Sequence, residues 1–204
     1  MFTGITCGTY RVIETKRRGA ILAYTVELPE DLAQGLKLGA SVSIDGVCQT
    51  VVRIDGGKIT FDAIAETLER TTLGRLQEGD LVSVERSVRV GDEIGGHDVS
   101  GHVLGVGEIV DVIDKDGVFD LCVRVPETYM RYIFPKGFVA VDGSSLTVGE
   151  TSADGFFWLH LIPETLRLTN LGRKKSGDLV NIEPDSRTMA VVETVERVLA
   201  QRGA

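Results

Sequence analysis

Short runs of Val, Ile and Thr alternate with polar positions along most of the chain. AYTVEL at 23–28, SVSI at 41–44 and DLVSVE at 80–85 are typical of strands with one buried face, and Gly, Asp and Asn separate such runs. Asp45-Gly46 stands between two of these runs and is a strong signal for a tight hairpin, because glycine accepts the positive φ that the turn requires. The pattern therefore predicts antiparallel strands, and their even spacing favours small closed barrels.

Helical patterns are few and short. PEDLAQGL at 29–36, AETLERT at 65–71, PETLRLT at 163–169 and PETYMRYI at 126–133 are each long enough for one or two turns. None of them is long enough to organise the fold, so we expect an all-β architecture with small helical connections.

The carboxy-terminal segment is different. Apolar residues recur at helical spacing in RTMAVVETVERVLAQR, namely Val191, Val192, Val195, Val198 and Leu199. This helix could pack on its own barrel, which base rates favour, or it could associate with copies of itself. The sequence leaves both interpretations open.

The sequence contains an internal repeat. Residues 66–85, ETLERTTLGRLQEGDLVSVE, match residues 164–183, ETLRLTNLGRKKSGDLVNIE, 98 positions later. Residues 41–52 match residues 138–149, 97 positions later. We therefore predict two domains of about equal length, followed by a helix outside the repeat. Their boundaries are 1–97, 98–185 and 186–204.

Composition excludes several classes of protein. The 204 residues include 43% hydrophobic and 25% charged side chains, as in an ordinary globular protein, and no apolar run reaches the length of a membrane span. A net charge of -8 argues against nucleic acid as a partner. The amino terminus carries no recognisable secretion signal, so we expect a cytoplasmic protein. Three scattered cysteines and three histidines lack metal-site spacing, and we expect no metal.

The two copies differ at positions where chemistry is possible. Ile5 and Cys48 of the first copy stand where the second copy has His102 and Ser145. Cys48 is either a small buried apolar residue or a reactive thiol, with about even weight before other evidence. His102 follows a glycine and is not on an apolar strand face, which favours an exposed or ligand-facing role.

Hydroxyl groups gather beside the second hairpin turn, Asp142-Gly143. Ser144, Ser145 and Thr147 suit recognition of a heterocycle or polyol through several hydrogen bonds, although a hydrated hairpin would have the same residues. Lys136 could steer an anion, but most surface lysines are only solvated. From the residues alone, we predict two barrels with similar polar pockets that treat similar ligands differently.

Several longer motifs carry a family resemblance over essentially the whole chain. They are MFTGI at the start, GVCxTV at 46–51, FDAIAETL at 61–68, GDEIGGHxxSGHV at 91–103, KGFVAVDGSSLTV at 136–148 and HLIPETL at 160–166. With these motifs the chain resembles the riboflavin synthases. The resemblance implies two tandem six-stranded antiparallel Greek-key β-barrels plus a C-terminal α-helix.

The resemblance also implies a reaction. Proteins of this family join two molecules of 6,7-dimethyl-8-ribityllumazine and transfer a four-carbon unit between them, which gives riboflavin and 5-amino-6-ribitylaminouracil. They use no cofactor. They form a homotrimer held partly by the carboxy-terminal helix, with the productive pair of pockets between subunits, and association with lumazine synthase is a further possible partnership.

Site residues follow by carrying the family motifs onto this chain. We expect Cys48, Ser41 and Thr50 to serve the first-copy site, and His102, Ser145 and Thr147 the second, with Asp142 and Asp185 in support. The segments expected to line the ring and ribityl chain, together with Lys136, are Gly4, Ile5 and Thr6; Gln49; Asp62, Ala63, Ile64, Ala65, Glu66 and Thr67; Gly101 and Val103; Leu146; and His160, Leu161, Ile162, Pro163, Glu164 and Thr165.

The chain departs from the family pattern at two positions. Gln49 stands where leucine is common, and Leu104 stands where aspartate is often found. Two other classes remain as alternatives. One is a non-catalytic lumazine- or flavin-binding antenna protein, against which Cys48, His102 and Ser145 argue. The other is a flavin reductase domain, which would need a glycine-rich nucleotide-binding fingerprint that the sequence lacks.

Overall fold

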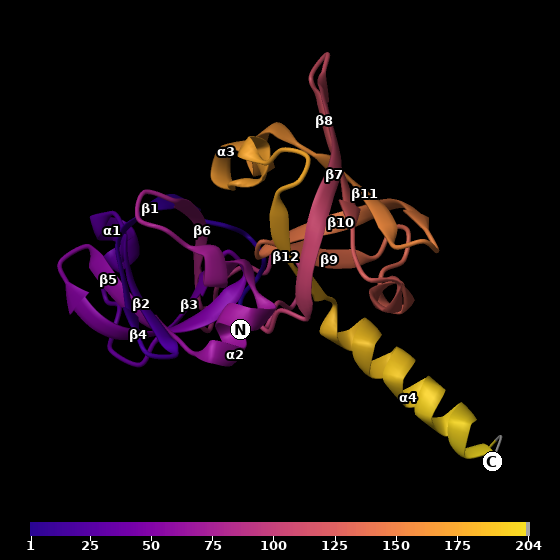
Figure 1. Ribbon diagram of the computed structural model, residues 1–204, viewed down its shortest axis with the longest axis horizontal. Helices are drawn as coiled ribbons and strands as arrows, with labels where there is room; N and C mark the ends of the chain where they lie inside the picture. The colour runs from indigo at the N-terminus through magenta and orange to yellow at the C-terminus, as the bar shows by residue number, and fades with distance from the viewer. Residues whose placement is uncertain (203–204) are drawn as a thin grey trace.

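A computed structural model describes residues 1–202, and its strands close into two separate barrels (Figure 1). Hydrogen-bonded neighbours in the first barrel follow the order β1-β2-β5-β4-β3-β6, and those in the second follow β10-β11-β8-β7-β12-β9. The first-barrel strands are β1 (Gly8–Arg18), β2 (Ile21–Glu27), β3 (Ser41–Ile44), β4 (Val47–Asp55), β5 (Lys58–Ala63) and β6 (Leu81–Arg86). The second-barrel strands are β7 (Gly105–Lys115), β8 (Val118–Arg124), β9 (Phe138–Val141), β10 (Ser144–Ser152), β11 (Phe156–Leu161) and β12 (Leu179–Pro184).

The two barrels have the same circular strand order. Strands β2 and β5 pair, as do β3 and β6, so neighbours in the sheet are not always neighbours in sequence, which is the Greek-key feature expected from the family resemblance. Both predicted tight hairpins are present. Asp45 and Gly46 have φ of 45° and 80°, and Asp142 and Gly143 have 45° and 81°, the left-handed pair that a two-residue hairpin turn of this kind requires.

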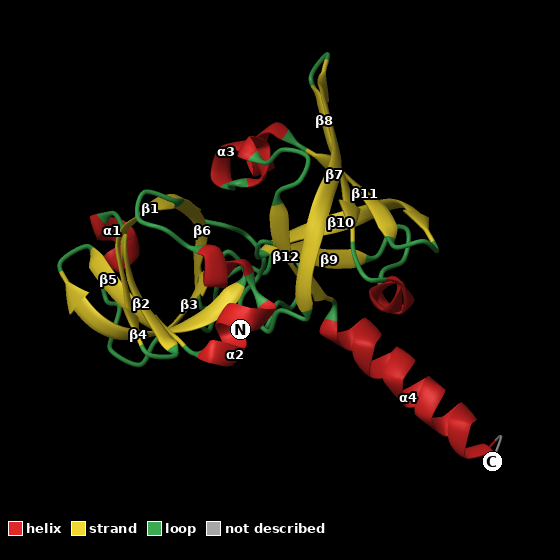
Figure 2. Ribbon diagram, viewed as in Figure 1, coloured by secondary structure: helices red, strands yellow, loops and turns green. Residues whose placement is uncertain are grey.

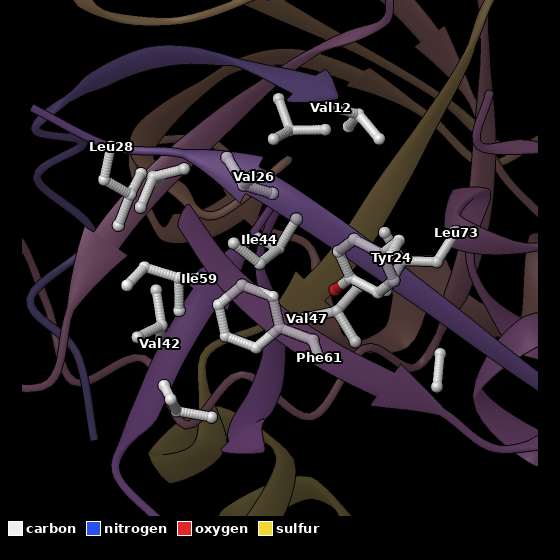
Figure 3. Close-up of a cluster of buried hydrophobic side chains, with 14 of the residues drawn as sticks. Val12, Tyr24, Val26, Leu28, Val42, Ile44, Val47, Ile59, Phe61 and Leu73 are labelled. Atoms are coloured by element: carbon white, nitrogen blue, oxygen red, sulfur yellow. The ribbon is translucent and has the colours of Figure 1, made fainter. Parts of the chain in front are cut away.

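Each barrel encloses its own hydrophobic core, because the inward residues of every strand are apolar. In the first barrel Tyr24 and Phe61 lie at the centre with ring centroids 5.5 Å apart, surrounded by Val, Ile and Leu side chains (Figure 3). The second barrel has an equivalent cluster that includes Phe157 and Leu159. The sequence repeat is therefore a repeat of two independent cores.

Short helical segments connect the strands (Figure 2). The α-helices among them are α1 (Glu30–Ala33), α2 (Ala65–Arg70) and α3 (Pro163–Leu168), and the 3-10 turns are η1 (Thr72–Arg75), η2 (Glu127–Tyr132) and η3 (Leu171–Arg173). α1, α2, α3 and η2 lie at the four positions that the sequence pattern indicated, with PETYMRYI forming 3-10 rather than α-helical turns, whereas η1 and η3 were not indicated by the pattern. No helix within residues 1–202 combines the length and apolar character needed to cross a membrane.

The last helix, α4 (Ser186–Arg202), extends away from both barrels (Figure 1). None of its residues is buried, and Val191, Val195 and Leu199 are 63%, 51% and 62% exposed. Its contact with the second barrel is polar, through Arg131 of η2, which bonds Glu193 and Glu196 at 2.8 Å. The interpretation that this helix packs its apolar face on its own barrel is therefore wrong. Only Asp185 separates α4 from β12, which leaves the helix no loop on which to fold back.

Candidate active site

Two segments outside the barrels cross between them. Phe2 and Val99 pair as an antiparallel bridge, with N–H to O distances of 2.7 and 3.1 Å, and both side chains are buried. Beyond this bridge the amino-terminal segment reaches the second barrel, where the Ser145 N–H donates to the Gly4 carbonyl at 2.8 Å. The linker between the barrels reaches the first barrel in the same way. Each barrel's hairpin is thus completed by the segment that precedes the other barrel.

Glycine is required at both crossing points. Gly4 has φ of 75°, and a Cβ there would lie 2.5 Å from Ser145 Cβ; Gly101 has φ of 80°, and its Cβ would lie 2.6 Å from Cys48 Cβ. No other residue allows so close an approach of backbone to the hairpin. The crossing points are therefore fixed to within one residue.

Two buried glutamates anchor the crossing segments. Glu85 accepts hydrogen bonds from Thr3 N (2.7 Å), Thr3 Oγ1 (2.8 Å) and Gly4 N (3.0 Å). Glu183 does the same for Ser100 N (2.7 Å), Ser100 Oγ (2.7 Å) and Gly101 N (3.0 Å). Burial raises the pKa of Glu85. The sequence analysis missed both residues, although each follows the same Gly-Asp-Leu-Val element in its copy.

At the first barrel, this crossing brings His102 next to Cys48. The Cys48 N–H donates to the Gly101 carbonyl at 2.9 Å, so the backbone of the next residue, His102, lies at the Cys48 end of this hairpin. The sequence analysis grouped His102 with Ser145 and Thr147, whereas the structure places its backbone at the first barrel. The repeat assigns His102 to the second copy in sequence, but the linker that carries it contacts the first barrel. The amino-terminal segment contacts the second barrel and brings Ile5 near Ser145.

The remaining first-site hydroxyls lie on the same hairpin as Cys48. Ser41 pairs with Thr50 across β3 and β4, two residues beyond the thiol. Cys48 is half-buried and Thr50 is exposed, so both face outward from the barrel wall. Val103, from the crossing linker, packs against the first core. Cys48, Ser41, Thr50 and His102 therefore form one outward-facing group.

The equivalent place on the second barrel is a pocket between the amino-terminal segment and α3. Gly4, Ile5 and Thr6 form one side, β10 contributes Ser144, Ser145 and Leu146, and Ile162, Glu164 and Thr165 close it. Thr6 Oγ1 and Ser144 Oγ are 3.1 Å apart, and Ile5 and Ile162 remain 47% and 63% exposed. The pocket therefore offers apolar surface for a flat ring together with hydroxyl partners.

His97 supports this second pocket and was not singled out from the sequence. Its Nδ1 lies 2.7 Å from Ser145 Oγ, and its ring stacks on Phe138 with centroids 5.2 Å apart. Burial lowers the pKa of His97, while Asp185 opposes that effect. A neutral imidazole that accepts from Ser145 at Nδ1 would orient the hydroxyl and increase its basicity. The residue lies inside the GGH element of the family motif, which was the only available signal.

The segments at the starts of α2 and α3 occupy equivalent places on the two barrels. Ile64 and Ile162 stand immediately before the helices and are exposed, whereas Ala63 and Leu161 are buried core residues. No side chain caps either helix, so first-turn N–H groups of Ala65–Thr67 and of Glu164 and Thr165 lack that partner. These segments can thus offer an apolar contact and backbone donors together.

Three predicted residues have mainly structural contacts. Asp142 accepts from Asn181 N at 2.8 Å and faces Lys174, and Asp185 caps α4 by accepting from Thr188 N (2.8 Å) and Oγ1 (2.7 Å). Lys136 adopts φ of 66° at the turn before β9, and its N–H donates to the Val148 carbonyl. Thr147 pairs with Phe138 of β9 and is exposed. Within residues 1–202, no side-chain hydrogen bond gives it a comparable structural role.

His160 lies on β11 beyond the second pocket. Its Nδ1 is 2.8 Å from Asp120 and its Nε2 is 3.2 Å from Glu150, and the hydrogen bond to Asp120 raises the pKa of the histidine. Asp62 is its counterpart on β5 and is exposed. These two positions give the equivalent faces of the barrels different charge.

The two departures from the family pattern lie away from the outward faces. Gln49 is buried, and its Nε2 donates to the Cys48 carbonyl at 3.0 Å, so it braces the backbone at the first site. The Leu104 N–H donates to the Ile182 carbonyl at the second barrel. Among residues 1–202, no three His, Cys, Asp or Glu side chains are grouped as a metal site would require.

This chain belongs to the lumazine-binding domain family, whose model matches residues 3–87 and 100–185, one match for each barrel. The full-length relatives narrow the assignment. Riboflavin synthase of Escherichia coli (strain K12) is 46% identical over 203 residues, which cover 99% of this chain and 95% of that protein. Riboflavin synthase of Chlamydia pneumoniae is 41% identical over 203 residues, covering 100% and 99%. Within the lumazine-binding proteins, the chain is a member of the riboflavin synthase family.

Solved structures support the fold. The crystal structure of LumP complexed with riboflavin superposes with a TM-score of 0.84 at 23% identity and covers 90% of this chain and 99% of that one. LumP complexed with 6,7-dimethyl-8-(1'-D-ribityl) lumazine gives a TM-score of 0.81. At this identity the likeness concerns the two-barrel architecture alone.

Proposed function

We propose that this chain converts two molecules of 6,7-dimethyl-8-ribityllumazine into riboflavin and 5-amino-6-ribitylaminouracil, with one lumazine on each kind of barrel. Riboflavin synthase activity follows from the full-length similarity to enzymes of that name. The observation that carries the two-site scheme is the exchange of crossing segments, which pairs Cys48 with His102 on one barrel and Ser145 with Ile5 on the other. Two equivalent barrel sites with different side chains suit a reaction in which identical molecules undergo different changes.

The chemistry demands position more than strong acids or bases. The C7 methyl group of the lumazine is acidic because the ring accepts the negative charge of the carbanion, so the substrate is its own electron sink. Holding two rings in a reactive arrangement can supply about 7 to 11 kcal/mol that an encounter in solution would lose in entropy. Side chains at each site then move protons at the methyl group and support the neighbouring ring.

We assign these roles by barrel. His102 is the candidate for proton movement at the first barrel, where Cys48 offers a nucleophile or hydrogen-bonding group and Thr50 and Ser41 bind the polar edge or ribityl chain. At the second barrel, Ser145 is the candidate group on the ring, oriented by His97 at 2.7 Å, with Thr147 beside it. Asp142 and Asp185 act through the frame, by holding the hairpin and α4.

The productive pair of sites is proposed to lie between subunits of a homotrimer. The exposed apolar side of α4 supports this arrangement, because Val191, Val195 and Leu199 have no cover within the chain. A helix of this kind can bring the first barrel of one subunit against the second barrel of another. Each lumazine would then be covered by its partner ring.

The test of function is direct. The purified protein is mixed with 6,7-dimethyl-8-ribityllumazine alone, and riboflavin and the uracil are both quantified. Equal amounts of the two products, without any added cofactor, support the proposal. Tight binding of the lumazine without turnover would instead identify an antenna or carrier protein and would contradict it.

Replacing His102 tests the assignment to the first barrel. We expect His102→Ala to lower kcat at least 10-fold, while the affinity for riboflavin changes less. This minimum loss of kcat is smaller than the loss that usually follows removal of a positioned general acid or base. Cys48→Ala should show the same separation of turnover from binding. Replacing the exposed Cys7 by serine is the matched control, and we expect it to leave both quantities unchanged. Full turnover in both site variants would contradict the assigned roles.

A further inference from the structure

The outer wall of the first barrel carries a polar groove across β1, β2, β4 and β5. Lys16, Arg18 and Arg53 bring positive charge to it, and Glu14 and Asp62 bring negative charge. Lys16 and Arg18 lie on the same face of β1 because they are two residues apart. Neither the proposed reaction nor the core uses these basic side chains.

The groove continues the proposed first site. Thr50 and Val52 are both exposed on β4, and one two-residue step along a strand covers about 7 Å. A register shift between Val51 and Arg53 then turns Arg53 outward as well, so it follows Val52 on the same face. Asp62, the first residue of the expected binding segment on β5, also lines the groove. A ribityl chain that starts near Thr50 and follows β4 therefore ends beside Arg53.

The charged end of Arg53 is held in place. Its Nε donates to Thr60 Oγ1 at 3.3 Å, its Nη2 lies 3.7 Å from Glu14, and Thr60 Oγ1 is 3.0 Å from Thr25 Oγ1. The ion pair with Arg53 compensates the negative charge of Glu14. Arginine, lysine and threonine hydroxyl groups are the partners that phosphate oxygens use most effectively.

The equivalent wall of the second barrel is more acidic. In the aligned registers, Ala23 corresponds to Asp120, Lys16 to Ile113 and Arg53 to Glu150, whereas Lys115 keeps the positive charge of Arg18. Asp120 and Glu150 flank His160. This wall is less favourable for a phosphate group than the first-barrel groove, whereas a neutral ribityl chain could bind to either barrel.

We propose that the first-barrel groove is a phosphate subsite, which allows this barrel to bind a flavin whose ribityl chain ends in a phosphate, while the second barrel rejects it. The proposal rests on the proposed placement of the lumazine at the two barrels. A phosphorylated flavin would occupy the first site and block the second substrate molecule from pairing there. The groove thus gives the enzyme a response to the phosphorylated form of its own product.

The test compares riboflavin with riboflavin 5'-phosphate by fluorescence titration. The unmodified protein should bind the phosphate ester at its first barrel at least as tightly as riboflavin, and the ester should inhibit riboflavin formation. Lys16→Gln with Arg18→Gln, and separately Arg53→Gln, should weaken binding of the ester about 10-fold and leave that of riboflavin unchanged. Lys115→Gln on the second barrel is the matched control, and it should change neither affinity.

Three results would overturn the subsite. An unchanged ratio of the two affinities in the charge variants would do so, and so would a control variant with the same loss as the first-barrel variants. Inorganic phosphate is included as a competitor, and binding of phosphate alone as tight as that of the ester would show that the flavin contributes nothing. Failure of riboflavin and lumazine themselves to bind would contradict the proposed function instead, so the two failures are distinguishable. Denaturant unfolding checks that each variant is folded.

Discussion

His97 of the linker and His160 of β11 both lie at the second barrel but have opposite environments. Burial lowers the pKa of His97, because the charged ring would lose hydration that Asp185 only partly replaces. His160 is about half exposed and lies between two carboxylates, and the hydrogen bond to Asp120 raises its pKa. The first ring is thus suited to accept a hydrogen bond from Ser145, and the second to carry charge.

We predict that these two histidines titrate on opposite sides of the ordinary value of 6.5. His160 favours the protonated form in the fold, so its contribution to stability is present below pH 6.5 and is lost as the pH rises through its native pKa. His97 contributes above pH 6.5, and its contribution is lost as the pH falls towards its lower native pKa. The measurement is an NMR titration of the imidazole resonances, assigned with His97→Gln and His160→Gln. Overlapping titrations would show that the two environments are alike in solution.

At the scale of elements, local patterns determined what the sequence could predict. The Asp45-Gly46 and Asp142-Gly143 turns are visible because a left-handed pair at a hairpin needs such residues. Strand alternation and the brief helices at 65–71 and 163–169 also depend on nearby residues only. These features are the ones the structure confirms.

The crossing segments could not be predicted in this way. Gly4 meets Ser145, and Gly101 meets Cys48, through contacts between residues far apart in the chain, so no local pattern shows which barrel each segment joins. The repeat grouped His102 with the second copy, whereas its backbone lies at the first barrel, because sequence order and spatial order differ there. The same limit explains why His97 beside Ser145 was missed. The direction of α4 likewise depends on a one-residue connection and on polar contacts with η2.

Helix α4 provides a test of assembly. We predict that Val195→Glu makes the protein monomeric, because in the proposed homotrimer a charge on the exposed apolar side would have to be buried between subunits. Light scattering after gel filtration measures the mass. Arg197→Gln changes the net charge by the same amount on the opposite side of the helix and should leave the assembly intact. A Val195→Glu protein of unchanged mass would show that α4 does not hold the subunits together.

At the scale of the whole molecule, the barrels meet through their β3–β4 and β9–β10 turns as well as through the crossing segments. Gly46 and Gly143 approach so closely that a Cβ on Gly46 would lie 2.5 Å from Gly143 N. Asp45 bonds Ser83 N (2.7 Å) of its own barrel and Asn170 Nδ2 (2.8 Å) of the other. Asn181 completes the junction by donating to the Asp45 carbonyl at 2.7 Å. The relative position of the two sites thus depends on a polar, buried junction.

Lys174 compensates the negative charge of the buried aspartates at this junction. Lys174 Nζ lies 3.1 Å from the fully buried Asp142 carboxylate, and it also donates to the Leu179 carbonyl at 2.9 Å. Burial, together with Asp142, raises the pKa of Asp45, and Lys174 acts against that rise. The first copy has Leu76 at the equivalent position, so a single lysine serves two aspartates.

Removing Lys174 tests how much its ion pair with Asp142 contributes to stability. We predict that Lys174→Met lowers the free energy of unfolding by about 3 to 5 kcal/mol, because Asp142 would keep a buried charge without its partner. Asp142→Asn in the Lys174→Met background should recover part of the loss, since the amide needs no counter-charge, and Lys175→Met is the exposed control. Denaturant unfolding of the unmodified protein, Lys174→Met, Asp142→Asn and the double variant measures the coupling. Additive losses would mean that the two side chains act independently, and the junction would then depend on its hydrogen bonds and its glycine contact rather than on the ion pair.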